Sequence, residues 1–212
     1  MNVPRPASCS PRQFRALLLA GLSLFPLASE AWIITGLGTN NPRRVFLAVG
    51  NSGAFWANNA TINTVTATLT PAQVVSGTPV AMTSNSTQSV SPYDNFTVCA
   101  PPAQVYVGAA YQRRVAADPG TATLQVTSPA NLVNADGDAI PFTEISWTVS
   151  ALGGDANPNA IPAGTFNGGT QTLTTVTQGT LRENCHTFAY ANTAVRPSGT
   201  YTGRVTYTLV TP

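Results

Sequence analysis

The chain has 212 residues, which is enough for one domain with a substantial core or for two small domains. Charged residues make up only 8% of it, against about 25% in a typical soluble protein, and all ten Lys+Arg residues are arginine. With 43% hydrophobic residues, this composition excludes a charge-rich disordered chain. The sparse positive charge also argues against a nucleic-acid partner, which would require a basic face.

The first 31 residues have the pattern of a secretory signal peptide. Arg5, Arg12 and Arg15 form a basic start; the apolar run 16–27 follows, and then small residues at 28, 29 and 31. A membrane-spanning helix is the alternative, but a span needs roughly 20 apolar residues and this run is shorter. We therefore expect cleavage after Ala31, export to the periplasm, cell surface or exterior, and no membrane span in the mature chain.

Cleavage changes the charge balance of the chain. It removes three of the ten arginines and one of the eight acidic residues, so that the mature chain, 32–212, keeps seven of each and has a formal net charge of zero. A neutral surface rich in threonine repels copies of itself only weakly. This suits a protein that packs against itself or against a neighbour.

Two cysteines remain after cleavage, Cys99 and Cys185. An exported protein folds in an oxidising compartment, so the sequence predicts a disulfide between them. The alternative is a reactive Cys185 thiol beside His186, the single histidine of the chain. Because neighbouring residues on a strand point to opposite faces, these two side chains would not pair as nucleophile and base.

Apolar and polar residues alternate along several segments of the mature chain, as is typical of strands with one buried and one exposed face. Threonine fills many of the polar positions and, being β-branched, suits a pleated strand. No segment has a sustained helical period. The predicted strands, separated by turns rich in Gly, Pro, Asn and Asp, are 45–49, 64–69, 96–99, 105–107, 121–127, 145–150, 172–176, 187–190 and 200–209.

Short strands joined by such turns indicate an all-β fold, an immunoglobulin-like antiparallel β-sandwich, with a β-barrel as the alternative. The expected organisation is a signal peptide at 1–31, an N-terminal arm at 32–41 and a single sandwich domain at 42–212. The stretch 150–169 is rich in Gly, Pro and Asn and would be a linker in a two-domain chain. The predicted disulfide spans that stretch, which favours one domain.

Motifs for catalysis are missing from the sequence. His186 is the only histidine, and the patterns G-x-S-x-G, H-E-x-x-H and the Walker loop are absent. A zinc site needs several Cys or His ligands, and the two remaining cysteines are expected to be bridged. We therefore predict that the protein is not an enzyme and needs no cofactor.

Two weaker candidate sites remain. Asp136 and Asp138 form the densest acidic spot and could supply the hard oxygens that calcium prefers; the alternative is a plain hairpin turn, in which Gly137 adopts a positive φ. Trp56 lies in an Asn-rich stretch and is a candidate glycan contact, whereas Trp147 lies on an alternating apolar face and is expected in the core.

The last fourteen residues, 199–212, have the pattern of a long alternating strand introduced by Gly199. Together with the signal peptide, this segment resembles the subunits of chaperone–usher pili of Gram-negative bacteria, including the archaic type with spore-coat-U-like domains. Thr211 departs from the pattern, since pilins commonly carry tyrosine at the penultimate position. The resemblance implies an incomplete immunoglobulin-like sandwich whose hydrophobic groove is filled by the N-terminal arm of a neighbour, which adds a strand.

The resemblance also implies assembly residues and partners. The partners would be further copies of the chain or a periplasmic chaperone, and the expected function is that of a secreted, non-enzymatic structural or adhesive surface protein of the pilus type. The alternatives are a self-contained secreted sandwich that binds carbohydrate, and a hydrolase whose site is not visible in the sequence. The assembly residues would be Trp32, Ile33, Ile34 and Leu37 on the arm, and Tyr201, Val205, Tyr207 and Leu209 on the terminal strand.

Overall fold

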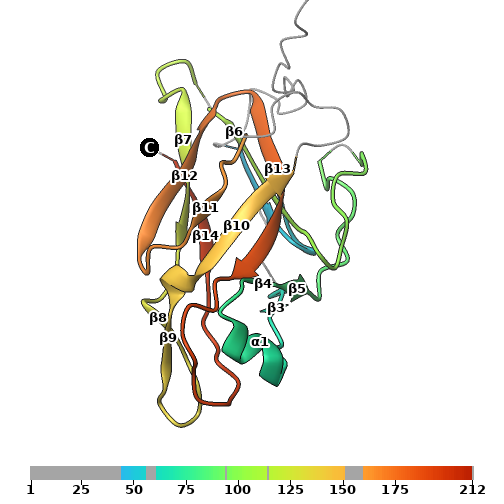
Figure 1. Ribbon diagram of the computed structural model, residues 1–212. Coiled ribbons are helices and arrows are strands. Elements are labelled where there is room, and N and C mark those ends of the chain that lie inside the picture. Colours follow the sequence, from blue (N-terminus) through green and yellow to red (C-terminus); the bar gives the residue numbers. More distant parts are fainter. Residues whose placement is uncertain (1–43, 56–60, 94, 114, 151–159, 212) are drawn as a thin grey trace, which may run out of the picture.

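The computed structural model describes residues 44–55, 61–93, 95–113, 115–150 and 160–211 (Figure 1). These residues form an almost entirely β structure with one short α-helix and one turn of 3-10 helix. The elements are β1 (Arg44–Val49), β2 (Ser52–Phe55), β3 (Val65–Thr66), α1 (Pro71–Ser76), β4 (Val80–Ala81), β5 (Thr83–Ser84), β6 (Val105–Gln112), β7 (Thr121–Thr127), β8 (Asn131–Val133), β9 (Ala139–Pro141), η1 (Phe142–Glu144), β10 (Ile145–Ser150), β11 (Gly164–Thr165), β12 (Thr170–Thr177), β13 (Thr180–Tyr190) and β14 (Thr206–Val210).

Two antiparallel sheets form the sandwich. The larger has seven strands in the order β11-β10-β13-β6-β1-β2, with β4 paired to the end of β13, and the smaller has the order β12-β7-β14. The strand pairs β3–β5 and β8–β9 lie with α1 at one end of the molecule (Figure 1). Because the sheets are not closed into a barrel, the predicted antiparallel sandwich is confirmed and the barrel alternative is wrong.

The main core lies between the two sheets and is built from alternate residues of their strands. In β7, Ala122, Leu124 and Val126 are buried, while the residues between them are more exposed. The same core takes Val107 and Tyr111 from β6 in the opposite sheet. The period-two pattern of the sequence therefore marks the side chains that leave water, which is the main source of stability in such a fold.

The large sheet is also covered on its outer face. Residues 85–93 and 95–104, which we call the strap, contribute Tyr93, Val98 and Cys99 to a second apolar cluster on that face. Because both faces are covered, β6 is buried along nearly its whole length, and its burial does not alternate. The sheet residues of this cluster are Phe46, Ala48, Tyr106, Ala110, Leu181 and Cys185.

The predicted disulfide between Cys99 and Cys185 is confirmed. The two Cα atoms are 5.5 Å apart, and both side chains are buried in the outer cluster. The bond joins the strap to β13 across a sequence separation of 86 residues. It is therefore the covalent link between the outer layer and the sandwich.

Several strand predictions are confirmed and others need correction. Strands occur at 44–49, 121–127 and 145–150 as expected, and β6, β12 and β13 extend beyond their predicted bounds. Of the segment 64–69 only Val65 and Thr66 form a strand. The segment 96–99 is not a strand, because it belongs to the strap, where Thr97 makes an isolated bridge with Val90.

The predicted terminal strand is shorter than expected. Only Thr206–Val210 is a strand, and Thr202 pairs instead with Val133 at the β8–β9 hairpin. Gly203 lies so close to this hairpin that an added Cβ would be 2.7 Å from Phe142 and 2.9 Å from Leu132. The first half of the segment therefore packs on the hairpin, and the prediction of one continuous strand is wrong.

The helix α1 was not predicted, although local signals for it exist. Thr70 caps the N-terminus of the helix in a capping box with Gln73, and Pro71 is the first residue of the helix. Gly77 ends the helix in the left-handed conformation, with φ +63°. At six residues and with no buried side chain, α1 is too short to show an apolar period.

Candidate assembly edge

The strand β14 is an end strand of the small sheet and pairs only with β7 among the described strands. Its side chains alternate: Tyr207 and Leu209 are half-buried and pack against the main core, and Thr206, Thr208 and Val210 are exposed. Burial raises the pKa of the Tyr207 phenol. Tyr207 and Leu209 thus belong to the core, while the main chain of β14 forms one border of the sheet.

The described edges of the two sheets differ in how well they are protected. Natural edges are commonly blunted by short length, bulges, proline or charge. At the opposite edge of the small sheet, β12 has a register shift between Thr172 and Thr174, and β11 at the edge of the large sheet is only two residues long. In contrast, β14 pairs in regular register over five residues and contains neither a charge nor a proline. It lacks the usual protection of an edge strand.

The opposite sheet supplies further apolar surface beside β14. β14 contacts β1, and Val45, Leu47 and Val49 of β1 are half-buried against the same core. On the side that faces the main core, the apolar side chains of both strands are only half-buried among the residues that the structure describes. A strand added next to β14 could therefore bring apolar side chains to both sheets.

The connection before β14 is anchored by an ion pair between the partly exposed Arg196 and the buried Glu144. Arg196 donates to the Glu144 carboxylate at 2.6 Å, and the Thr193 amide donates to the second oxygen at 3.3 Å. The hydrogen bond from Arg196 to Glu144 is the main cause of a raised Arg196 pKa. Further along, the Tyr201 hydroxyl donates to the Pro197 carbonyl at 2.9 Å, and Tyr201 and Val205 pack on the main core. No local sequence pattern indicates this anchor, because its partners are 52 residues apart.

The eight predicted assembly residues divide into two groups. Tyr201, Val205, Tyr207 and Leu209 lie together at the rim of the main core. Trp32, Ile33, Ile34 and Leu37 lie outside the described residues, as do the predicted cleavage site at Ala31 and the candidate glycan contact Trp56. Trp147 is buried in the core, as expected.

Asp136 and Asp138 lie at the tip of the β8–β9 hairpin. The Asn134 side-chain oxygen accepts hydrogen bonds from the Asp136 and Asp138 amides, and its NH₂ group donates to the Asp138 carboxylate at 2.9 Å. Gly137 has φ +89°. These bonds organise a tight turn, and within the described ranges no group of three or more His, Cys, Asp or Glu side chains comes together.

His186 and Cys185 are on opposite faces of β13. The Cys185 sulfur is in the outer cluster. The His186 ring lies on the other face of the strand, parallel to the Trp147 ring, and the centroids of the two rings are 6.0 Å apart. Burial lowers the pKa of His186 to about 3, and neither ring nitrogen has a hydrogen-bond partner among the described residues. The imidazole is therefore a neutral core side chain.

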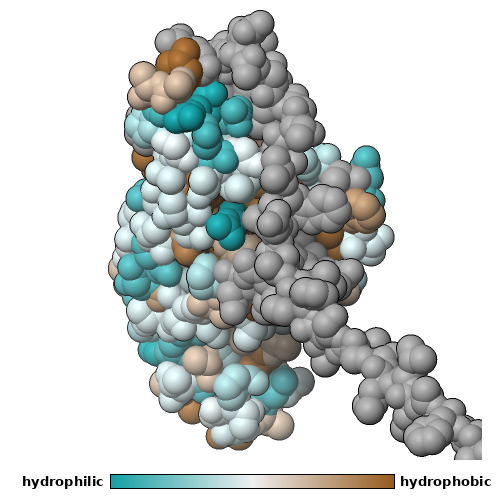
Figure 2. Space-filling view, turned by 90° about the horizontal axis from the view of Figure 1, so that it is seen from above, coloured by the Kyte–Doolittle hydropathy of each residue, from teal (hydrophilic) through white to brown (hydrophobic). Residues whose placement is uncertain are grey.

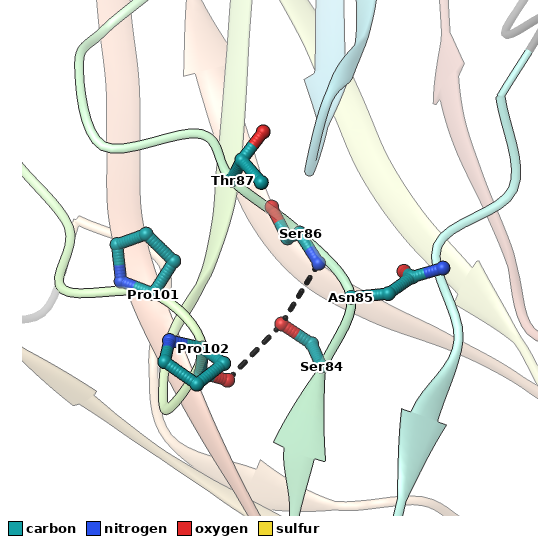
Figure 3. Close-up of a pocket in the computed structure, with 6 residues that line it drawn as sticks. All are labelled: Ser84, Asn85, Ser86, Thr87, Pro101 and Pro102. Carbon is teal, nitrogen blue, oxygen red and sulfur yellow. Dashed lines mark hydrogen bonds between the residues drawn. The ribbon is translucent and has the colours of Figure 1, made fainter.

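An open pocket of about 310 Å³ is formed by strap residues together with Ser84 of β5 (Figure 3). Its hydroxyl groups are already in use: Ser84 donates to the Pro102 carbonyl at 3.1 Å, and Ser86 donates to the Asn51 side chain at 2.9 Å. Such a lining leaves few free polar groups for a sugar. The residues around the pocket are Ser84, Asn85, Ser86, Thr87, Pro101 and Pro102.

The surface is weakly polar on the face that Figure 2 shows, with small, separate hydrophilic and hydrophobic spots. No helix in the described part of the chain has the length and apolar character to span a membrane.

The fold and the disulfide together define an all-β antiparallel sandwich with a covalently tethered outer layer. No protein-family model, curated protein or solved structure matches the chain.

Proposed function

We propose that this protein is an exported, non-enzymatic structural subunit that accepts an additional β-strand along β14. The observation that carries the proposal is the unprotected edge of β14, which is regular and uncharged and has half-buried apolar residues on its inner side. Main-chain hydrogen bonds to an added strand would provide affinity, and the alternate side chains would fix its register. The disulfide supports export, since such bonds persist in oxidising compartments.

The narrower form of the proposal is a pilus-type subunit, in which the donor strand is the arm at 32–41 of another copy. The resemblance of the signal peptide and the terminal segment to pilins supports this form. Deletion of residues 32–41 from the mature chain should then abolish polymers and leave a folded monomer. Polymers that survive the deletion would exclude the arm as donor.

Hydrogen exchange tests the docking edge independently of the donor. The full chain is expressed in a Gram-negative host, and the periplasmic product, expected to begin at Trp32, is compared in concentrated and in dilute samples. Amides of 206–210 should exchange more slowly in the concentrated, associated sample, while amides in the middle strand β7 should be unchanged. Association without protection of 206–210, or no association at any concentration, would contradict the proposal.

Carbohydrate binding remains the second class of function. Its candidate residue, Trp56, lies outside the described residues, and the hydroxyls of the described pocket bond to neighbouring groups. No specific observation therefore favours it over strand addition.

A further inference from the structure

The sequence of β14 is complementary to itself in the antiparallel direction. When two copies of Thr-Tyr-Thr-Leu-Val pair about their central residue, Thr208 faces Thr208 of the second copy. Tyr207 then faces Leu209, and Thr206 faces Val210. The threonine pair is of a kind that stabilises antiparallel sheets, and each of the other two pairs places a residue that favours strands, Tyr207 or Thr206, opposite an apolar side chain.

We propose that the protein forms a two-fold symmetric dimer in which β14 pairs with β14 of a second copy. The two small sheets then join into one continuous sheet with the order β12-β7-β14-β14-β7-β12. This inference rests on the proposed function, because it names the occupant of the same edge. The interface is isologous: the same residues contribute from both copies, and pairing them closes both exposed edges.

The side-chain directions fit this register. Tyr207 and Leu209 point toward the main core in each copy, so the Tyr207–Leu209 pairs would form an apolar row on the core side of the joined sheet. Thr206, Thr208 and Val210 would lie on the outer, solvent-facing side. Because both residues of every facing pair are on the same side of the sheet, no polar side chain is forced into the core.

Charge does not oppose the pairing. Neither β14 nor its neighbour β7 contains a charged residue. The nearest arginine along the chain, Arg204, is four residues from the axis, so the two copies of it would be about 27 Å apart at 3.4 Å per residue. That separation exceeds the screening length of about 8 Å at physiological salt.

The observations favour a second β14 over the arm as the occupant. In this register every β14 side chain faces an uncharged partner on the same side of the sheet, and the half-buried Tyr207 and Leu209 are the residues whose burial it would complete. The arm at 32–41, which the resemblance implies as donor, is the competing outcome of the test.

Cysteine cross-linking tests the symmetry axis in the full mature chain. A residue on the axis faces its own copy, so Thr208→Cys should give a covalent dimer under mild oxidation. Thr206→Cys alone should not, since the two sulfurs would be about 14 Å apart along the strands. A mixture of Thr206→Cys and Val210→Cys proteins should cross-link again, because these positions face each other.

Charge substitution at the axis provides a second readout. Thr208→Glu and Thr208→Arg each place like charges opposite each other and should raise the dissociation constant by roughly tenfold, measured by sedimentation. An equimolar mixture of the two variants should associate at least as well as the unmodified protein. Thr172→Glu on β12, at the opposite edge of the small sheet, is the matched control and should leave association unchanged.

The outcomes separate this inference from the proposed function. If 206–210 is protected on association but Thr208→Cys does not cross-link, another strand, such as the arm, occupies the edge: the inference fails and the proposed function stands. If the protein stays monomeric, or associates without protecting 206–210, both fail. Cross-linking of Thr206→Cys alone would also overturn the proposed register.

Discussion

Gly203 shows how a single residue sets the course of the terminal segment. A Cβ at this position would be 2.7 Å from a Phe142 ring carbon, 2.9 Å from Leu132 and 3.3 Å from Pro129. Gly203→Ala should therefore cost about 1–3 kcal/mol in the free energy of unfolding, because the packed hairpin must move. Gly120→Ala is the matched control, since no atom lies within 4 Å of its added Cβ. Urea denaturation of both variants is the measurement; equal effects would contradict the steric explanation.

His186 should make the fold sensitive to acid. Its pKa is about 3 in the folded protein and 6.5 in the unfolded chain, so the unfolded chain binds the extra proton between these values. The contribution to stability is complete above pH 6.5 and is lost as the pH falls toward 3. At pH 4 the loss should reach about 3 kcal/mol.

The substitution His186→Phe tests this titration. It keeps a ring next to Trp147 and removes the ionisable group. Melting temperatures of the original chain and the variant, measured at about pH 7.5 and about pH 4, should diverge only at the lower pH, where the variant is the more stable. If the melting temperatures of both proteins fell equally at the lower pH, the acid sensitivity would come from the carboxylates instead.

At the scale of elements, the buried Glu144 should hold the connection between β13 and β14. Glu144→Gln removes the charge that pairs with Arg196 at 2.6 Å, and Arg196 itself is partly exposed. We expect a loss of about 1–3 kcal/mol in unfolding free energy, less than for a fully buried pair, and faster proteolysis within 191–205. Asp136→Asn at the exposed hairpin tip should have no comparable effect on either measurement.

The disulfide should stabilise the strap more than the sandwich. In the double variant Cys99→Ser/Cys185→Ser the strap keeps only its non-covalent contacts, including the bond from Ser91 to the buried Glu183 at 2.8 Å. Chain entropy predicts a loss of up to about 4–5 kcal/mol for a closed loop of this length. Hydrogen exchange should rise first in the strap and later in β7; a uniform rise across both elements would show that the two layers unfold together.

The sequence predicts strands with one exposed face better than strands that are buried on both faces. Strands such as β7 have one wet face, so threonines alternate with apolar residues and the period is visible. The strand β6 is buried on both faces because the strap covers it, and a strand buried on both faces does not alternate. The strap itself lacks a local pattern, since its position depends on a bond between residues far apart in sequence.

The same limit applies to the candidate edge. The alternation of Tyr207 and Leu209 with threonine predicts a strand there, and the structure has one. The exit of the preceding residues toward the β8–β9 hairpin depends on contacts of Gly203 with Leu132 and Phe142. Such contacts join segments that are distant in sequence, so a local pattern cannot indicate them.

At the scale of the whole molecule, charge has little part in the proposed association. The mature chain would have seven basic and seven acidic residues, and β14 contains none of them. Association through main-chain hydrogen bonds and apolar side chains should therefore change little between about 0.05 and 0.5 M salt. The mixture of Thr208→Glu and Thr208→Arg proteins is an internal control, because its added ion pair should weaken measurably over the same range. A dissociation constant of the unmodified protein that rose steeply with salt would place the interface on charged residues elsewhere on the surface.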